Sequence, residues 1–533
     1  MISPMGTDDT LAARKSGQNL RLAELLAAVS LATNLADDAP FGSALQDAVT
    51  VVAFAGEAGL AAEDVSDAYY LALLYHVGCT AVVLAQARIA GGDDVSSRRW
   101  FSEADYADRL QMLRLAATRV SREWGLGARA QGVAGMITAP KDFVADAIGG
   151  ICEVGARFGA RLGAGPHITE ALEHAYARWD GKVFPASPSG EAISPLARLV
   201  HVVHVAHAFH RAGGRDAADE VVRTRRGGEL DPTLCDLWLA HSEELLRGAG
   251  PDSIWEVALD AEPEPRRFVA PSHIDAVTET FADFVDLKAS HAVAHSSHVA
   301  DLASAAGAGL GLTEKEVATL RRAAQVHDLG NVSVPHRILV KKEPIDRTER
   351  DRIRLHPYHT HRVLSVSESL REIGAAAGMH HERPDGTGYH RGLSAAAIPL
   401  PARVLAVAEA YQSMREDRPW RGALPAGRAA DELRREAREG RLDRRSVDAV
   451  LDAAGQGGAR RRAARSWPAG LTDREVDVLR LLASGRSNKQ TAIQLHVSEA
   501  TVHTHVINVY GKIGLNTRAG ATLFALENDL IQL

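Results

Sequence analysis

Two distant stretches of the chain repeat one another at a constant offset, which is the distance from Asp180 to Asp385. The shared residues are Asp180-Gly181, Ile193 and Ala197-Arg198 in the earlier stretch, and Asp385-Gly386, Ile398 and Ala402-Arg403 in the later one. With small gaps, Leu230-Asp231 and Leu442-Asp443 continue the match. Self-similarity of this kind indicates a duplicated domain that builds the same core twice.

Apolar residues recur at helical spacing in most of the sequence, whereas alternating β-branched runs are scarce. A chain of 533 residues exceeds the size that one core usually supports. We therefore predict an all-α protein with two related helical domains at residues 18–248 and 270–452. A linker at 453–468, which contains four arginines, precedes a small domain at 469–533.

Composition narrows the class of protein. The net charge of −7 excludes a uniformly basic nucleic-acid coat, so DNA contacts would have to be local. Three dispersed cysteines without CxxC spacing exclude a disulfide framework and fit a reducing compartment. No segment has the length and apolarity of a membrane span, and the first residues are polar. We expect a cytoplasmic protein with no membrane partner.

Histidines concentrate in the second copy, where His291 to His390 contain 11 of the chain's 23. Neutral imidazole and carboxylate are ligands of Fe, Mn and Zn, so His327-Asp328 and the vicinal His380-His381 suggest a polynuclear metal site. The alternative is a set of solvated surface histidines. Their position inside apolar helical segments, beside Asp and Gly, favours the metal site.

From Asp286 to Arg421 the second copy resembles the HD-GYP phosphohydrolases. The motifs that carry the resemblance are Asp286-Leu287-Lys288, His295-Ser296, His327-Asp328-Leu329-Gly330, His356-Pro357, His380-His381-Glu382, Asp385-Gly386-Thr387-Gly388-Tyr389, Ile398-Pro399-Leu400 and Ala402-Arg403-Val404. The resemblance implies an all-helical fold, two or three metal ions and hydrolysis of cyclic di-GMP. We expect two divalent ions, Fe or Mn, with Zn as an option.

The resemblance also assigns roles to residues by position. The implied metal ligands are His295, His327, Asp328, His356, His380, His381 and Glu409. Asp328 would also serve in catalysis, in which two metal ions share a hydroxide that attacks phosphorus. Lys288 and Arg403 are candidates to bind the ligand's phosphates, although a structural or surface role is at least as plausible for each.

The second copy departs from the family at four positions. Asn331 stands at the catalytic position where the family has Lys, so a cation for the scissile phosphate is missing. Glu409 replaces Asp, His291 replaces a carboxylate of a third metal, and His390 replaces the Pro of Gly-Tyr-Pro. Metal binding is expected, whereas activity as a metal-dependent cyclic di-GMP phosphodiesterase is left open.

The first copy has lost nearly all of these ligands. By sequence, Val77 falls at the position of Asp328, and Ala175 and Tyr176 fall at those of His380 and His381. We predict a degenerate domain that keeps the scaffold for packing, for pairing with the second copy or for binding a small ligand. His76 and His204 are interpreted as buried core residues.

The last domain shows the pattern of three short capped helices joined by tight turns. Thr472 and Glu475 form a capping-box pair, Gly485 ends that helix, and Ser498 caps a later one. Residues 471–533 resemble the LuxR/NarL-type DNA-binding domain, which implies a four-helix helix-turn-helix that binds double-stranded DNA. The motifs are Leu471-Thr472, Arg474-Glu475, Ser487-Asn488-Lys489, Thr501-Val502, His505, Lys512-Ile513-Gly514 and Arg518.

By this resemblance the helix near residues 498–512 enters the major groove. The expected base-facing residues are Glu499, Ala500, His503 and Thr504, and the expected phosphate-facing residues are Asn488, Lys489, Thr501, His505 and Lys512. Six basic and six acidic residues cancel over 471–533, so one domain alone should bind DNA weakly. Homodimerisation, usual for the family, would double the contacts.

Two hypotheses follow for the whole chain. The first is a transcription regulator whose HD-GYP-like domains sense cyclic di-GMP or a related phosphorylated signal. The second is a metal-dependent cyclic di-GMP phosphodiesterase with a DNA-binding tail. Asn331 and Glu409 favour the sensor, and the intact His-Asp and His-His pairs favour the enzyme.

Overall fold

The computed structural model describes residues 20–36, 40–79, 143–182, 187–247, 254–288, 294–455, 467–495, 497–528 and 530–531, with scattered positions between 83 and 134. The linker arginines and His291 lie outside the described residues. The chain divides into two compact units, residues 1–277 and 278–533. The finer limits predicted for the domains stay predictions.

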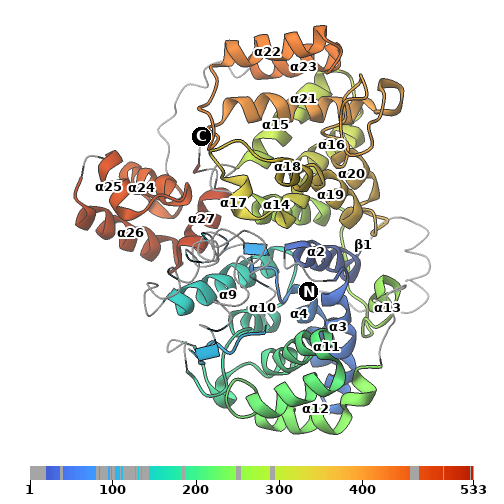
Figure 1. Cartoon of the computed structure of the whole chain (residues 1–533), viewed down its shortest axis with the longest axis vertical. Helices are drawn as coiled ribbons and strands as arrows, with labels where there is room; N and C mark the ends of the chain where they lie inside the picture. The colour runs from blue at the N-terminus through green and yellow to red at the C-terminus, as the bar shows by residue number, and fades with distance from the viewer. Residues whose placement is uncertain are drawn as a thin grey trace. The chain divides into compact units, whose positions relative to one another are not determined.

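Unit 1 is helical and carries one small two-stranded sheet. Its helices are α2 (Leu22–Ala36), α3 (Ser43–Glu57), α4 (Ala62–Leu74), α9 (Phe143–Arg161), α10 (Pro166–Glu173), α11 (Pro195–Arg225), α12 (Pro232–Leu245) and α13 (Ile254–Asp260), with the 3-10 turn η2 (Gly190–Ala192). Strands β1 (Leu20–Arg21) and β2 (Phe268–Val269) pair antiparallel, with Leu20 opposite Val269. Helix α3 packs against α4 and α11, and these helices contribute to the core together with the buried residues of α2, α9, α10 and α12 (Figure 1).

Unit 2 begins within α14 (His273–Asp286) and is also helical. It continues with α15 (His295–Gly309), α16 (Glu314–Val326), η4 (Leu329–Ser333), α17 (His336–Leu339), α18 (Arg347–Arg354), α19 (His356–Leu364), α20 (Arg371–Ala377), η5 (Ala395–Ala397), α21 (Leu400–Arg415), α22 (Ala426–Arg438) and α23 (Arg444–Gly455). Helix α15 packs against α16, α21 and α23 (Figure 1). The all-α prediction is confirmed, because the described residues contain little strand.

The helix boundaries repeat between the two units. Helices α3 and α15 both have 15 residues, and α4 and α16 both have 13. The distance along the chain from the start of α3 to the start of α15 equals that from the start of α4 to the start of α16. The three-residue turns η2 and η5 match likewise at the offset found in the sequence. Tandem copies of one helical fold explain this agreement, as predicted from the repeat.

A pair of glycines fixes how the copies correspond. A Cβ added to Gly78 would lie 2.0 Å from the Ile151 carbonyl oxygen of α9, and a Cβ added to Gly330 would lie 2.0 Å from the His356 carbonyl oxygen of α19. Only glycine permits this approach of backbone to backbone. Pairing the glycines puts His76, not Val77, at the position of Asp328, which corrects the sequence alignment.

An arginine–aspartate pair repeats in the same way. Arg198 donates to Asp231 over 2.6 Å, and Arg403 lies 3.5 Å from Asp443. Each aspartate also accepts at least one backbone N–H group at the start of the next helix, α12 or α23. Such capping stabilises a helix by about 1 kcal/mol. The Ala-Arg motif shared by the copies therefore has a structural reason.

The helix-turn-helix part contains η6 (Pro468–Gly470), α24 (Asp473–Ala483), α25 (Asn488–Leu495), α26 (Glu499–Ile513) and α27 (Arg518–Glu527). Its core includes Val478 and Leu482 of α24, Ala492 of α25, and Val502 and Val506 of α26. Thr472 caps α24 in a capping box with Glu475, and Ser498 caps α26, as the sequence predicts. The four helices match the predicted fold.

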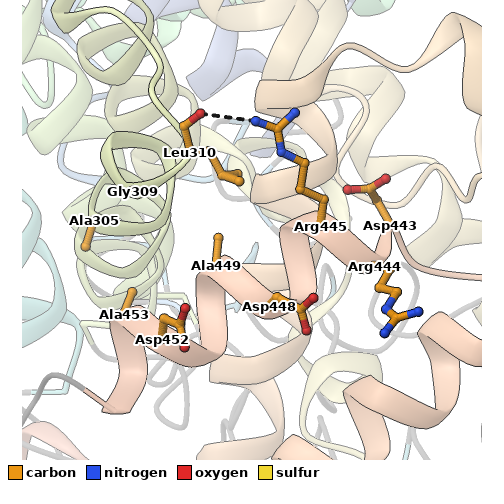
Figure 2. A pocket seen from close by; sticks show the side chains of 10 residues that line it. All are labelled: Ala305, Gly309, Leu310, Asp443, Arg444, Arg445, Asp448, Ala449, Asp452 and Ala453. Atoms are coloured by element: carbon orange, nitrogen blue, oxygen red, sulfur yellow. Dashed lines mark hydrogen bonds between the residues drawn. The ribbon is translucent and has the colours of Figure 1, made fainter.

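An open pocket of about 720 Å³ lies between α15 and α23. Figure 2 shows Asp448 and Asp452 on α23 among its lining residues, and the Arg445 guanidinium donating to the Leu310 carbonyl oxygen over 3.4 Å. None of the predicted metal ligands is among the lining residues, so this pocket is not the candidate centre. Separately, none of the described helices has the length and apolarity needed to cross a membrane.

Candidate metal centre and nucleic-acid interface

Helix ends of unit 2 bring the predicted histidines together. His295 begins α15, His327 and Asp328 follow α16, His356 begins α19, and His380 follows α20. The four histidines are buried, with His327 and His380 fully inaccessible. Ligand atoms of His295, His327 and Asp328 lie within 4.8 Å of one another, and so do those of His356, His380 and His381.

Backbone carbonyls set the tautomer of three of these imidazoles. Nδ1 of His327, His356 and His380 lies 2.7, 2.6 and 2.7 Å from the carbonyl oxygens of Ala324, Ile353 and Ala377. A carbonyl only accepts, so each Nδ1 carries the proton and each Nε2 has a free lone pair. This orientation is the one that metal-binding histidines need.

Asp328 stands between the two groups of histidines. Its Oδ1 lies 3.2 Å from Nε2 of His356 and 3.7 Å from Nε2 of His380. Its Oδ2 lies 3.6 Å from Nε2 of His327. The carboxylate thus places Oδ1 near His356 and His380 and Oδ2 near His327.

Electrostatics favour the metal-binding forms of Asp328, His380 and His381. Burial works against the charged carboxylate, but His327 and His356 hold the pKa of Asp328 well below its usual range. Burial, followed by neighbouring histidines, holds the pKa values of His380 and His381 well below the usual range. Near neutral pH Asp328 is therefore ionised and His380 and His381 are neutral. At His295 burial opposes the charged form, but Glu416 raises the pKa above its usual value.

The donor set fits a metal ion. Nε2 of His327 is buried and has no hydrogen-bond partner among the described residues. Nε2 of His356 and His380 lie 2.9 Å apart although both are unprotonated in the tautomers above. Two lone pairs this close repel, and a shared cation removes the repulsion. The residues present therefore suit borderline divalent metals.

Glu416 is a member of the site that sequence reasoning missed. Its buried carboxylate oxygens lie 2.9 and 3.1 Å from Nδ1 of His295, and Arg418 and Gln412 also contact it. A carboxylate on Nδ1 orients an imidazole and leaves Nε2 for a metal. It follows α21 and belongs to none of the motifs, so only the fold reveals it.

The remaining predicted residues differ in their surroundings. Glu409 accepts from Ser413 over 2.7 Å and belongs to neither group of ligand atoms found among the described residues. Asn331 follows the cluster within η4, and its Oδ1 is buried without a partner in the described part of the chain. His381 stacks on Tyr389 with ring centroids 4.6 Å apart.

Lys288 and Arg403 make structural contacts. The Lys288 ammonium is buried and donates to the Val332 carbonyl oxygen. The Arg403 guanidinium donates to the carbonyl oxygens of Ile398 and Ala395, besides its contact with Asp443. Because backbone acceptors occupy both cations, we withdraw them as phosphate-binding candidates in favour of the structural alternative.

Glu382, the third residue of the His-His-Glu motif, has a structural role. Its buried carboxylate accepts the backbone N–H groups of Arg391 and Leu393, both over 2.7 Å. A Cβ at Gly388 would lie 2.4 Å from the Arg383 nitrogen, so this loop requires glycine there. Glu382 and Gly388 thereby fix the loop that carries Tyr389.

The expected DNA-facing surface is polar and accessible. Lys489 of α25 and Glu499, Ala500, Thr501, His503 and Thr504 of α26 are exposed, while Asn488 and His505 are partly buried. Val502, Val506 and Val509 of α26 are buried against the other helices. Helix α26 therefore presents one polar face to solvent, as a recognition helix requires.

Lys512 is the exception among these residues. Its ammonium donates to Glu475 Oε2 over 2.7 Å and to the Gly470 carbonyl oxygen over 3.1 Å. This contact ties the end of α26 to the capping box of α24. We therefore reassign Lys512 from a phosphate contact to a residue that holds the domain together.

Fold and site define a helical domain with a histidine–aspartate centre, followed by a helix-turn-helix. Residues 279–446 match the HD domain family, and residues 469–525 match the bacterial regulatory proteins of the luxR family. The chain thus combines an HD domain with a LuxR-type helix-turn-helix, and the second match identifies the C-terminal part as that of a DNA-binding regulator.

Relatives of known activity resemble the HD region. The 3'3'-cGAMP-specific phosphodiesterase 3 of Vibrio cholerae is 23% identical over 69% of this chain and 81% of its own length. The cyclic di-GMP phosphodiesterase response regulator RpfG of Xanthomonas campestris is 39% identical over 29% of this chain and 40% of its own length.

A solved structure resembles the fold of this chain. The crystal structure of a cyclic GMP-AMP phosphodiesterase of V. cholerae (V-cGAP3) has a TM-score of 0.57 and 19% identity, over 82% of this chain and 98% of that one. At this identity the likeness concerns the fold alone.

Proposed function

We propose that the protein is a DNA-binding transcription regulator whose HD domain binds two divalent metal ions and, through them, a cyclic dinucleotide. The observation that carries this proposal is Asp328, which offers Oδ1 to His356 and His380 and Oδ2 to His327. Shared carboxylates of this kind suit paired ions, each completed by its own histidines. Fe or Mn is preferred, and Zn is an alternative.

Bound metal ions would neutralise the phosphodiester oxygens and lower the pKa of a bound water. The protein's own part is to orient its ligands, through the backbone carbonyls on His327, His356 and His380 and through Glu416 on His295. Asn331 supplies an uncharged amide where a proton donor or cation would assist the leaving oxygen. This favours ligand binding over rapid turnover.

The surroundings of the cluster offer contacts for a nucleotide. Tyr389 stacks on His381, and the guanidinium of the exposed Arg354 lies 4.8 Å from the Tyr389 ring centre. Tyr358 is 40% exposed and packs edge-on against His390. A guanidinium and accessible aromatic rings suit phosphate and nucleobase groups, respectively.

Cyclic dinucleotide binding at the HD domain would act on the DNA-binding domain. Helix α26 has its base-facing candidates exposed, yet the domain carries no net positive charge. Binding strength then depends on how many phosphate contacts are made together. We propose that two chains pair on DNA and that cyclic dinucleotide binding changes how well their helix-turn-helix domains engage it.

A second candidate function is phosphodiesterase activity. The His and Asp cluster and the activities of the V. cholerae and X. campestris relatives support it. The two candidates differ in one measurable quantity, the rate at which bound ligand is converted to linear product.

The test uses the purified full chain with Mn²⁺ or Fe²⁺. Cyclic di-GMP and 3'3'-cGAMP are each titrated to measure binding, and linear product is followed by chromatography. We expect metal-dependent binding with slow or absent turnover. Asp328→Asn should abolish this binding. Asp351→Asn, which changes an exposed aspartate of α18, should retain it. Rapid turnover by the unaltered chain would favour the enzyme, and no binding of either nucleotide would contradict both candidates.

A further inference from the structure

A second group of metal-type ligands lies in unit 1, the copy that has lost the histidines of the HD site. Asp47 of α3, His76 just after α4 and His204 of α11 have ligand atoms within 4.8 Å of one another. Nδ1 of His204 lies 3.4 Å from Asp47 Oδ2, and the rings of His76 and His204 have centroids 4.7 Å apart. Asp47 and His204 are buried, and His76 is partly exposed.

The group is not a simple remnant of the HD site. With Gly78 paired to Gly330, His76 takes the position of Asp328 and Tyr75 that of His327. Asp47 lies one helical turn beyond Ser43, the residue that begins α3 as His295 begins α15. A histidine therefore stands where unit 2 has its aspartate, and the aspartate of unit 1 comes from a new position.

Neighbouring residues hold Asp47 in place. Its Oδ1 lies 2.7 Å from Nδ1 of His207 and 3.8 Å from the Arg211 guanidinium, so Oδ2 is the oxygen that faces His204. The Tyr75 ring packs against His204 with centroids 5.1 Å apart. Outer contacts that fix a carboxylate and an imidazole are typical of metal sites.

The protonation states suit this chemistry. Burial opposes the charge, but hydrogen bonds from His204 and His207 lower the pKa of Asp47. Burial lowers the pKa of His204, so its imidazole is neutral near pH 7. A carboxylate together with two imidazoles is a donor set that a divalent transition metal binds.

We propose that Asp47, His76 and His204 form a separate metal site in unit 1, which binds one divalent ion of the Zn²⁺ class. Three protein ligands leave a fourth position for water, which solvent reaches beside the partly exposed His76. The ion would join α3, the end of α4 and α11, three helices that pack against one another in this unit. A copy without the HD ligands would thereby keep a metal of its own.

The test isolates this site in the untagged full chain by combining Asp328→Asn with His356→Ala, which removes ligands of unit 2. After dialysis against Co²⁺, we expect one retained ion per chain with visible absorption of low-coordinate cobalt. Adding His76→Asn should remove the ion. Adding His241→Ala should not, although His241 lies in an exposed group with Glu57 and Glu244 in the same unit.

A variant that gains an absorption band distinguishes loss of a metal ligand from misfolding. His76→Cys should keep the ion and add a sulfur-to-cobalt charge-transfer band in the near ultraviolet, because a thiolate would then bind the metal. The wild-type chain should likewise bind one ion more than the single variant His76→Asn. No retained cobalt in the unit 2 double variant, together with equal metal content of wild type and His76→Asn, would overturn the proposal.

Discussion

The carboxylate of Glu416 lies 2.9 Å from Nδ1 of His295, a residue that precedes it by 121 positions. Both side chains are buried, and Gln412 and Arg418 hold the carboxylate from other directions. With Nδ1 held by Glu416, Nε2 of His295 is left for a metal ion shared with His327 and Asp328, its partners in the candidate centre. The ligands of this centre are thus held by contacts that lie outside the recognisable motifs.

Replacing Glu416 by Gln should weaken metal binding without removing a ligand. The amide keeps the size of the side chain but loses the charge that supports His295, and such changes usually cost 10- to 100-fold in affinity. Titration of the metal-free chain with Mn²⁺ measures the effect. Glu343→Gln, at an exposed glutamate of unit 2, is the matched control. Equal affinities for both variants would argue against this role of Glu416.

Asn331→Lys should raise phosphodiester hydrolysis. A lysine there would supply the positive charge and proton that Asn331 cannot, and proton-transfer groups contribute about 10²-fold or more. The rate of linear product formation from cyclic di-GMP measures this, and Asn331→Gln controls for size without adding charge. If both variants turn over ligand equally slowly, the missing cation is not what limits the reaction.

Glu475→Gln should destabilise α24 in a pH-dependent manner. Burial alone would raise the pKa of Glu475, but hydrogen bonds from Lys512 and Thr472 lower it below its ordinary value. A lowered folded-state pKa adds stability that is present above the unfolded value near 4.5 and is lost as the pH falls through the folded value. At pH 7 we expect a loss of about 1 kcal/mol, the usual size for a helix cap.

Hydrogen exchange of the α24 amides in the full chain measures this loss. The difference between wild type and Glu475→Gln should hold from pH 7 to about pH 5 and shrink below it, because the carboxylate then becomes protonated. Glu499→Gln changes an exposed glutamate of the same domain and should leave α24 unaffected. A difference that does not vary with pH would mean that the charge of Glu475 plays no part.

Substitutions on the DNA-facing surface should change either the sequence preference or the overall affinity for DNA. His503→Ala with Thr504→Ala should reduce the preference for a selected duplex over random DNA, because these side chains lie on the exposed face of α26. Lys489→Ala should weaken binding to all sequences and reduce the salt slope by about 1. Fluorescence anisotropy at several salt concentrations distinguishes the two effects.

Lys315→Ala, at an exposed lysine of the HD domain, is the control for a simple loss of charge. Deletion of residues 471–533 should abolish binding to every duplex. Binding that survives this deletion would show that another part of the chain contacts DNA.

Much of the fold could be predicted from the sequence because the signals are local. Helical periodicity gives the all-α class, the match of Asp180-Gly181 to Asp385-Gly386 gives the duplication, and Thr472 with Glu475 marks the start of α24. Each signal depends on neighbours along the chain. The capping box of α24 shows the predicted pairing directly in its hydrogen bonds.

The contacts that sequence could not give are those between distant segments. Glu416 meets His295 only because α21 packs against α15, and no spacing rule connects them. Lys288 and Arg403 look like phosphate ligands by residue type, but backbone carbonyls brought near by the fold occupy them. Asp47 likewise joins His204 through packing of α3 against α11.

The central claim is that a cyclic dinucleotide bound at the Asp328 centre changes the affinity of the protein for DNA. The most direct measurement is the Kd for a duplex selected by the intact protein, with Mn²⁺ present, in the absence and at saturation of cyclic di-GMP or 3'3'-cGAMP. Our account predicts a change of about 5-fold or more with at least one of these nucleotides, the usual range for coupled sites, and no change in Asp328→Asn. The same Kd with and without bound nucleotide in the wild-type protein would contradict it.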